Sequence, residues 1–212
     1  MECFKRRILQ LVFYGSYRMN GTKWKSEYDS NIRNFFKMEN TKIKDQPLKE
    51  CQWKIPGIRY TLFCCDGAAN GNPSAEGYGV IARNHQSQVI GTISGSVGLA
   101  TSFIAKDVSV VFTTEWAIKL QCSKIIIRSS DKTVMKAFRN GMVPWYLRAR
   151  WLTSTSRLSD IQFEDCHKEI SFSAESLARY GTGLPQGTTI IHNGRPSSLV
   201  QVEMPHTTYY RI

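Results

Sequence analysis

The stretch Cys64–Gly79, with the sequence CCDGAANGNPSAEGYG, joins an apolar segment to a loop rich in Gly, Ala, Asn and Pro. Its carboxylate, Asp66, closes a strand-like segment, RYTLFCCD, that begins at Arg59. Ending a buried strand on an acid is costly unless the charge is paired or solvated. Three roles account for such an acid: a metal ligand, an N-cap or a solvated turn residue. Asp66 is therefore the first candidate functional residue.

The segments that follow this stretch predict a mixed α/β fold. Three strands joined by short turns indicate an antiparallel meander, at 59–66, 76–84 and 89–98. Two more strands are expected at 124–130 and 161–168. Helices are expected at 102–122, 131–141, within 143–159 and at 171–181. The predicted fold is a five-stranded mixed sheet, three antiparallel strands and then two more, flanked by helices.

Composition shifts divide the chain into three parts. Residues 1–57 show no sustained period and are expected to form a basic leader and linker. Residues 58–181 are expected to form the compact domain. Residues 182–212 are broken by Gly and Pro and are expected to form an irregular tail.

The net charge of +11, from 28 Lys and Arg against 17 Asp and Glu, makes a polyanion the first partner to consider. No stretch approaches the roughly 18 apolar residues needed to cross a bilayer, so no membrane partner is expected.

Cysteine usage and the first residues bear on localisation. The six cysteines include no CxxC pair, which favours free thiols in a reducing compartment, cytoplasm or nucleus. The first 18 residues place basic residues before an apolar run, as an organelle transit peptide does, but Gln10 interrupts the run.

The order of these elements, with DGAANGNP after the first strand, resembles the ribonucleases H. Within that family the chain is most similar to the plant domain related to retrotransposon reverse transcriptases. The likeness covers about residues 52–181 and is carried further by SFIA and TEWAIKL, SKIIIRSSDKTVMKAF, VPWYLRARWL and AESLARYG. The resemblance implies a ribonuclease H-like fold.

The resemblance also implies an endonuclease that hydrolyses the RNA strand of a duplex with two Mg²⁺ or Mn²⁺ ions, roughly 4 Å apart. Family members use four carboxylates. Carried onto this sequence, the first falls on Asp66 and the last on Glu175, both acids. The second falls on Lys106 and the third on Ser130. The catalytic set is thus degenerate, since an ammonium repels the divalent cations that these positions would hold.

An acid follows each lost position, Asp107 after Lys106 and Asp131 after Ser130. One step along a helix turns the side chain by about 100°, so Asp107 is expected to point away as a solvated or salt-bridged acid. Asp131 leaves a strand into a turn. It either N-caps the next helix or rejoins Asp66 and Glu175 as a catalytic metal ligand.

Further residues are candidates for nucleic-acid binding. The family loop that contacts the 2′-hydroxyls of RNA is matched by Asn70, Gly71 and Asn72. The alternative is an ordinary Asn-Gly turn that binds no partner. Arg148 and Arg150 would supply phosphate affinity, and Lys106 would contact a phosphate directly. The neighbouring Trp145 and Trp151 are expected to be core residues beside snorkelling arginines.

Two functions remain open. One is a divalent-metal-dependent ribonuclease that binds an RNA/DNA hybrid or double-stranded RNA and cleaves the RNA through a rearranged site of Asp66, Glu175 and Asp131. The other is a pseudoenzyme that binds nucleic acid or a protein without turnover. A decayed transposon fragment without a selected role is the third reading. Binding follows from the surviving residues, whereas hydrolysis requires a repair of the site.

Overall fold

The computed structural model of the chain describes residues 31, 34–36, 49–69, 71 and 74–211. The chain divides into two units, Met1–Lys49 with Ile212, and Glu50–Arg211. The second unit holds the site described below. Two of the predicted RNA-contacting residues, Asn70 and Asn72, and most of the predicted leader lie outside the described residues.

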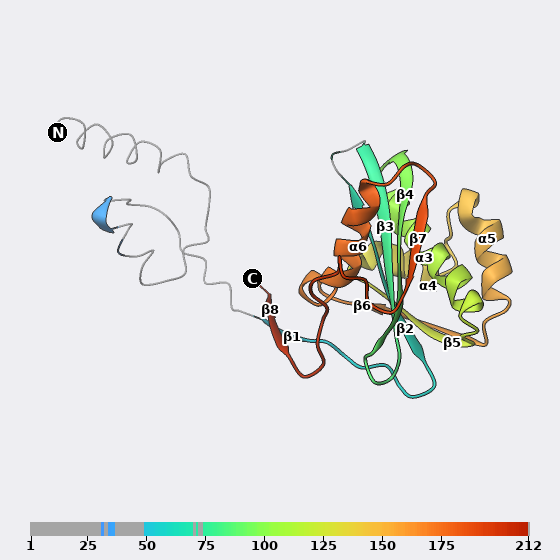
Figure 1. Cartoon of the computed structure of the whole chain (residues 1–212), viewed down its shortest axis with the longest axis horizontal. Helices are drawn as coiled ribbons and strands as arrows, with labels where there is room; N and C mark the ends of the chain where they lie inside the picture. The colour runs from blue at the N-terminus through green and yellow to red at the C-terminus, as the bar shows by residue number, and fades with distance from the viewer. Residues whose placement is uncertain (1–30, 32–33, 37–48, 70, 72–73, 212) are drawn as a thin grey trace. The chain divides into compact units, whose positions relative to one another are not determined.

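A six-stranded mixed sheet forms the centre of the second unit (Figure 1). Its order is β6-β5-β2-β3-β4-β7. Strands β2, β3, β4 and β7 pair antiparallel, whereas β5 and β6 run parallel to β2. The bounds are β2 Thr61–Ala69, β3 Ser74–Arg83, β4 Val89–Ala100, β5 Lys124–Ser129, β6 Asp160–Asp165 and β7 Thr189–Asn193. The five predicted strands are confirmed, and β7 adds a sixth.

Helices cover both faces of this sheet (Figure 1). Helix α6 lies on one face, and α3, α4 and α5 lie on the other. The bounds are α3 Ser102–Lys119, α4 Lys132–Arg139, α5 Trp145–Thr155 and α6 Phe172–Thr182, with a 3₁₀ turn at Lys168–Ile170. All four predicted helices are confirmed. Among the described residues, no helix is long and apolar enough to span a bilayer.

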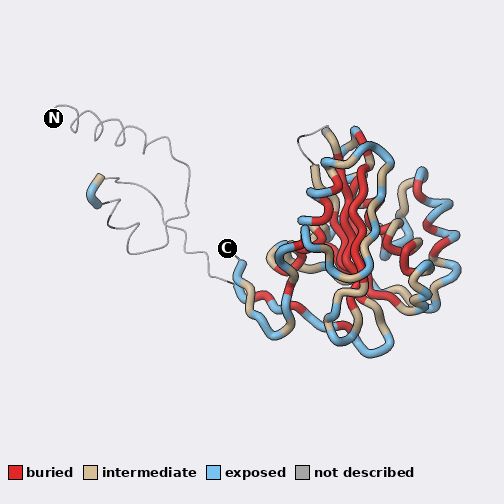
Figure 2. Tube along the Cα trace, viewed as in Figure 1, coloured by how far each residue is buried: buried red, intermediate tan, exposed pale blue. Residues whose placement is uncertain are grey.

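Strand alternation explains the two cores. Successive side chains of a strand point to opposite faces, so adjacent cysteines separate. Cys65 joins the core under α3, and Cys64 joins the core under α6. Both are fully buried, as are most residues of the central strands (Figure 2). The sheet is therefore a rigid platform for whatever its strand ends present.

Two glycines allow helices to approach this platform closely. A Cβ on Gly79 would lie 2.3 Å from the Ala178 nitrogen, so α6 packs directly on the backbone of β3. A Cβ on Gly67 would lie 2.5 Å from the Lys106 nitrogen. The first turns of α3 therefore reach the residue after Asp66.

The C-terminal segment, for which the sequence predicts an irregular tail, contributes two strands. Strand β7 pairs with β4, and β8, Thr208–Arg211, pairs with β1, Lys49–Gln52. Between them, Glu203 is fully buried and accepts hydrogen bonds from the Ser173 backbone N–H at 2.7 Å and hydroxyl at 2.6 Å. It also pairs with Arg83. This partner is 120 residues away in sequence, so local patterns could not reveal it.

The predicted domain start at residue 58 is also too late. Cys51 and Trp53 are buried, and the compact unit begins at Glu50. The Trp53 ring contacts two guanidinium groups, with Arg83 at 4.8 Å and Arg128 at 5.4 Å from its centroid. Such cation–π contacts stabilise a desolvated tryptophan and hold the entry segment on the sheet.

Candidate nucleic-acid interface

Asp66 lies where the parallel pairing of β2 with β5 has just ended. The last β2–β5 pair is Cys64 with Arg128, whereas the antiparallel pairing with β3 continues to Ala69. The strand thus extends three residues beyond the predicted end at Asp66. Its carboxylate is 5% exposed and accepts a hydrogen bond from the Gly67 N–H at 2.8 Å.

Ser130 meets Asp66 because β5 and β2 run parallel and end at the same edge. The Ser130 hydroxyl donates to Oδ2 of Asp66 at 3.5 Å, a long contact. Burial raises the pKa of Asp66 to about 6, and the Glu175 charge adds to this effect. The Gly67 N–H and the Lys106 ammonium oppose it. Asp66 is therefore a desolvated carboxylate with few compensating donors.

Lys106 binds Asp131 across this edge of the sheet. The Lys106 Nζ lies 2.8 Å from Oδ2 of Asp131, and the two side chains are 21% and 19% exposed. The other oxygen of Asp131 accepts the N–H groups of Thr133 and Val134 at 2.9 and 3.1 Å. Burial alone would raise the pKa of Asp131, but Lys106 and these N–H groups hold it below its usual value. Asp131 thus N-caps α4, as one of the two alternatives predicts, and its role as a catalytic metal ligand stays a prediction.

Glu175 stands on the first turn of α6, and its charge acts on Asp66. Its Oε1 accepts from Arg179 Nη2 at 2.7 Å and Nε at 3.1 Å. The Glu175 carboxylate is half-buried and already forms an ion pair with Arg179. We call Asp66, Lys106, Ser130, Asp131 and Glu175 the Asp66 site.

These side chains do not fit a two-metal centre. Mg²⁺ and Mn²⁺ require several free oxygen ligands, and a paired centre needs carboxylates that contact both ions. At the Asp66 site one position is an ammonium, one is a hydroxyl, and Asp131 and Glu175 are bound to basic side chains. Within the part of the chain that the structure describes, no group of three or more His, Cys, Asp or Glu can hold a metal ion.

Glu76 is a candidate that sequence reasoning missed. It lies on β3 opposite Ala69, is fully buried, and has no hydrogen-bond partner for either oxygen among the described residues. Burial raises its pKa, and the Lys106 ammonium opposes this. The period-two alternation of Glu76, Tyr78 and Val80 could have revealed it, since the latter two face the core under α3.

Asp107 contradicts the expectation of a solvated or salt-bridged acid. It is 1% exposed and accepts a hydrogen bond from the Tyr146 hydroxyl at 3.4 Å, while its other oxygen has no hydrogen-bond partner among the described residues. Burial raises its pKa to about 6, against the effect of the Tyr146 hydroxyl. It does point away from Lys106, toward α5, as the helical step predicts.

The basic residues predicted on α5 are not gathered at the Asp66 site. Arg150 binds Glu115 of α3 through two contacts of 2.7 Å and lies 4.6 Å from the Phe112 ring centroid. Arg148 is exposed on the same helix. Trp151 is buried in the core as expected, but Trp145 is 86% exposed, so the core assignment of Trp145 is wrong.

Gly71 has a φ of 128°, which glycine alone adopts readily.

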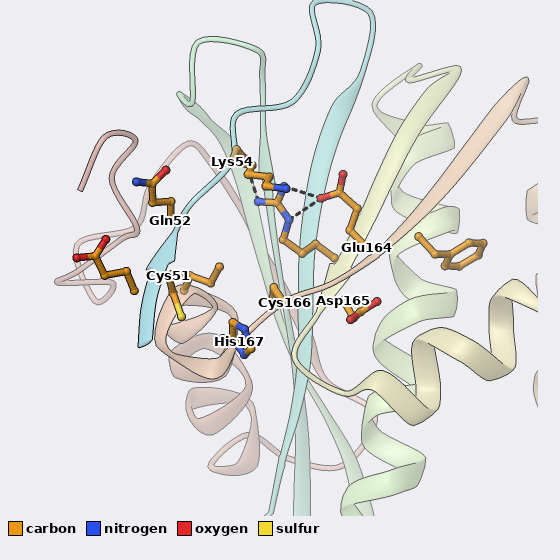
Figure 3. A pocket seen from close by; sticks show the side chains of 11 residues that line it. Cys51, Gln52, Lys54, Glu164, Asp165, Cys166 and His167 are labelled. Atoms are coloured by element: carbon orange, nitrogen blue, oxygen red, sulfur yellow. Dashed lines mark hydrogen bonds and ion pairs between the residues drawn. The ribbon is translucent and has the colours of Figure 1, made fainter. Parts of the chain in front are cut away.

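A cavity of about 480 Å³ lies between β1 and the end of β6 (Figure 3). The buried Arg128 crosses it, donating to Glu164 at 2.7 and 3.0 Å and to the Lys54 carbonyl at 3.0 Å. A further acid of the wall, Asp165, lies 3.7 Å from Arg139. Because these charges are paired, the cavity offers no clear charge excess to a ligand.

No protein-family model matches the sequence, and no curated protein matches it significantly. Solved structures do match. An RNase H1 from the halophilic archaeon Halobacterium salinarum has a TM-score of 0.53 at 18% identity, over 57% of this chain and 96% of its own. The N-terminal RNase H domain of a Mycobacterium tuberculosis protein has a TM-score of 0.54 at 19% identity, over 58% and 93%.

A third similar structure, LC11-RNase H1 in complex with an RNA/DNA hybrid, has a TM-score of 0.50 at 16% identity, over 57% of this chain and 96% of its own. At these identities the likeness concerns the fold. The chain therefore has a ribonuclease H-like fold, as its sequence predicts, and the shared part is somewhat more than half of it.

Proposed function

We propose that this protein binds RNA-containing duplexes at the Asp66 site and that it does so without the two-metal hydrolysis expected of ribonucleases H. The observation that carries the proposal is the ion pair of 2.8 Å between Lys106 and Asp131, next to Asp66. It places a fixed cation among carboxylates, at the edge of a ribonuclease H-like sheet. An ammonium group can bind a phosphate as a point charge.

Charge and fold support a nucleic-acid partner. The chain carries a net charge of +11, and Lys and Arg contacts to phosphates supply most of the non-specific affinity for nucleic acids. One protein of similar fold is in complex with an RNA/DNA hybrid. RNA-containing duplexes differ from DNA by their 2′-hydroxyls and A-like shape, which a protein can read from the minor groove.

Metal-dependent cleavage is the second candidate. It is favoured by the electrostatic coupling of Asp66 with Glu175, the two acids kept at the positions that the resemblance assigns to metal ligands. Cleavage would require Asp131 to exchange Lys106 for a metal ion. The two candidates therefore predict opposite effects of removing Lys106.

Binding and cleavage can be separated with labelled RNA/DNA hybrid, double-stranded RNA and double-stranded DNA. We expect salt-sensitive binding, measured by fluorescence anisotropy, that is tighter for the two RNA-containing duplexes and at least as tight in EDTA as in Mg²⁺. We expect no cut product from the wild-type protein in Mg²⁺ or Mn²⁺. RNA cleavage in metal that disappears in Asp66→Asn would contradict the proposal and establish the second candidate.

A double variant, Lys106→Glu with Ser130→Asp, tests the reading of the site itself. It returns acids to both altered positions, and we expect metal-dependent hybrid cleavage to appear from none. Lys119→Glu with Ser123→Asp is the matched control, since Lys119 lies at the far end of α3. No activity in either double variant, with both proteins folded, would mean that the altered positions are not those of the metal ligands.

A further inference from the structure

A second cavity, of about 380 Å³, adjoins the Asp66 site. Four parts of the chain contribute to it: the residue after β5, the start of α4, the segment between β6 and α6, and the end of β8. The polar residues that line it are Ser130, Lys132, His167, Lys168, Glu169 and Arg211. We call it the basic cavity. Its volume is in the usual range for small-ligand pockets, about 300–1,000 Å³.

The charge of the basic cavity is strongly unbalanced. Lys132, Lys168 and Arg211 are cations at neutral pH, and Glu169 is the one acid of the lining. This differs from the cavity of Figure 3, where Arg128 is bound to Glu164. An anion is therefore the ligand that the basic cavity favours.

Hydrogen-bond donors dominate this lining as well. Nη1 of Arg211 lies 3.2 Å from Nδ1 of His167. Because a guanidinium can only donate, Nδ1 is the acceptor in this contact, which places the ring proton on Nε2. With the ammonium groups of Lys132 and Lys168, the cavity offers donors from three segments, while the Ser130 hydroxyl donates to Asp66. A phosphate group, which has only acceptor oxygens when ionised, matches such a set.

Ser130 connects the basic cavity to the Asp66 site. It lines the cavity, and its hydroxyl donates to Asp66 at 3.5 Å. Burial raises the pKa of Asp66, and the Lys168 ammonium is among the charges that oppose this. A strand bound at the Asp66 site therefore has a cationic cavity within reach of its next phosphate groups.

We propose that the basic cavity holds one phosphate group of a nucleic-acid strand and that Lys132, Lys168 and Arg211 supply the neutralising charge. The inference rests on the proposed function and extends it to a defined phosphate position. It also gives the C-terminal segment a role in binding, since Arg211 belongs to β8. The phosphate is either internal to the strand or the 5′ phosphate of its end.

The test compares hybrid binding by the wild-type protein, Arg211→Gln, and the double variant Lys132→Gln with Lys168→Gln. Lys119→Gln is the control, because it removes the same charge at the far end of α3. All four substituted side chains are exposed or half-buried, so the fold should tolerate the changes. The logarithm of the association constant falls linearly with the logarithm of the salt concentration, and each lost phosphate contact reduces the magnitude of this slope by about 0.7–0.9. Because the three cations share one phosphate group, we expect the magnitude of the slope to fall by at most about one such step in Arg211→Gln and in the double variant, and not at all in Lys119→Gln.

Two RNA strands, one with a 5′ phosphate and one with a 5′ hydroxyl, distinguish the sources of the phosphate. If the cavity takes the strand end, only the phosphorylated hybrid loses affinity in Arg211→Gln. If it takes an internal phosphate, both hybrids lose affinity equally. Slopes for the cavity variants that match Lys119→Gln would overturn the inference.

Pyrophosphate tests the cavity when the duplex test cannot. A wild-type protein that binds no duplex overturns the proposed function. The melting temperature in pyrophosphate then decides whether the cavity binds phosphate at all. An increase that is lost in the double variant and kept in Lys119→Gln retains the phosphate site, and no increase overturns it as well.

Discussion

Two ion pairs of this molecule join similar charges in different surroundings. Arg83 and Glu203 lie in the interior, with side chains 1% and 0% exposed. Lys106 and Asp131 lie at the edge of the sheet, with side chains 21% and 19% exposed. The buried pair joins β3 to the C-terminal segment, and the other neutralises an acid beside Asp66. The same chemistry therefore serves the fold in one place and occupies the candidate site in the other.

Desolvation explains the difference. A buried charge without its partner is costly, so each member of the interior pair depends strongly on the other. A pair that water can reach is weakly stabilising, because solvent takes over when one member is lost. Water can thus solvate Lys106 when its partner is lost, whereas Arg83 has no such substitute. The predictions below test this contrast.

The largest effect is expected for Glu203→Leu. It leaves Arg83 buried without a counter-charge and removes the acceptor of Ser173, so the free energy of unfolding should fall by about 3–5 kcal/mol. Urea unfolding at neutral pH measures it. The double variant Arg83→Met with Glu203→Leu should recover part of the loss. A double variant as unstable as the single one would show that the pair's charge is not the cause.

Asp66→Asn should increase stability, by about 1–3 kcal/mol at pH 7–8. Burial raises the pKa of Asp66 from 3.8 to about 6, so the folded state favours the protonated form and loses stability as the pH rises through that range. Below about pH 4 the gain should vanish. Unfolding curves from pH 3 to 8 give the profile, and a loss of stability at pH 8 would contradict the assignment.

Lys106→Met should change stability little, by about 1 kcal/mol or less at pH 7. The low pKa of Asp131 means that this pair stabilises the fold above the ordinary pKa of an aspartate and ceases to do so as the pH falls. Binding should change more. The salt slope for an RNA/DNA hybrid should fall by about 0.7–0.9 if Lys106 contacts a phosphate. An unchanged slope would separate Lys106 from the interface.

The smallest effect is expected for Arg179→Gln. Its pair with Glu175 is an exposed i,i+4 contact on α6, so its loss should cost about 0.2–0.5 kcal/mol. Thermal unfolding beside the wild-type protein measures it. A loss of unfolding free energy above 1 kcal/mol would show that Glu175 depends on Arg179 as strongly as Arg83 depends on Glu203. The contrast between buried and accessible ion pairs would then be wrong.

Local sequence patterns predicted most of the fold. Alternation and turn residues located β2, β3 and β4, and a β-branched run located β5. They also placed Asp66 and Ser130 at the ends of two of these strands. The patterns missed β7, whose side chains alternate between exposed and intermediate, because an edge strand has a weak apolar signature. They misassigned Trp145, because a sequence does not show which side of a helix start remains uncovered.

The candidate site divides in the same way. That Lys106 and Ser130 stand where the resemblance implies acids is a matter of residue identity, which the sequence gives directly. Three features of the site could not be read in this way, because each depends on segments far apart in the chain. They are the pairing of Lys106 with Asp131, the burial of Glu76 and the contact of Arg211 with His167.

The sequence alone determined the order of strands and helices and the positive charge, because periodicity and residue type are local properties. The tertiary structure alone decided which charges neutralise one another. Ion pairing depends on distance and on access to water, and both are set only when α3, α4 and the C-terminal segment pack against the sheet.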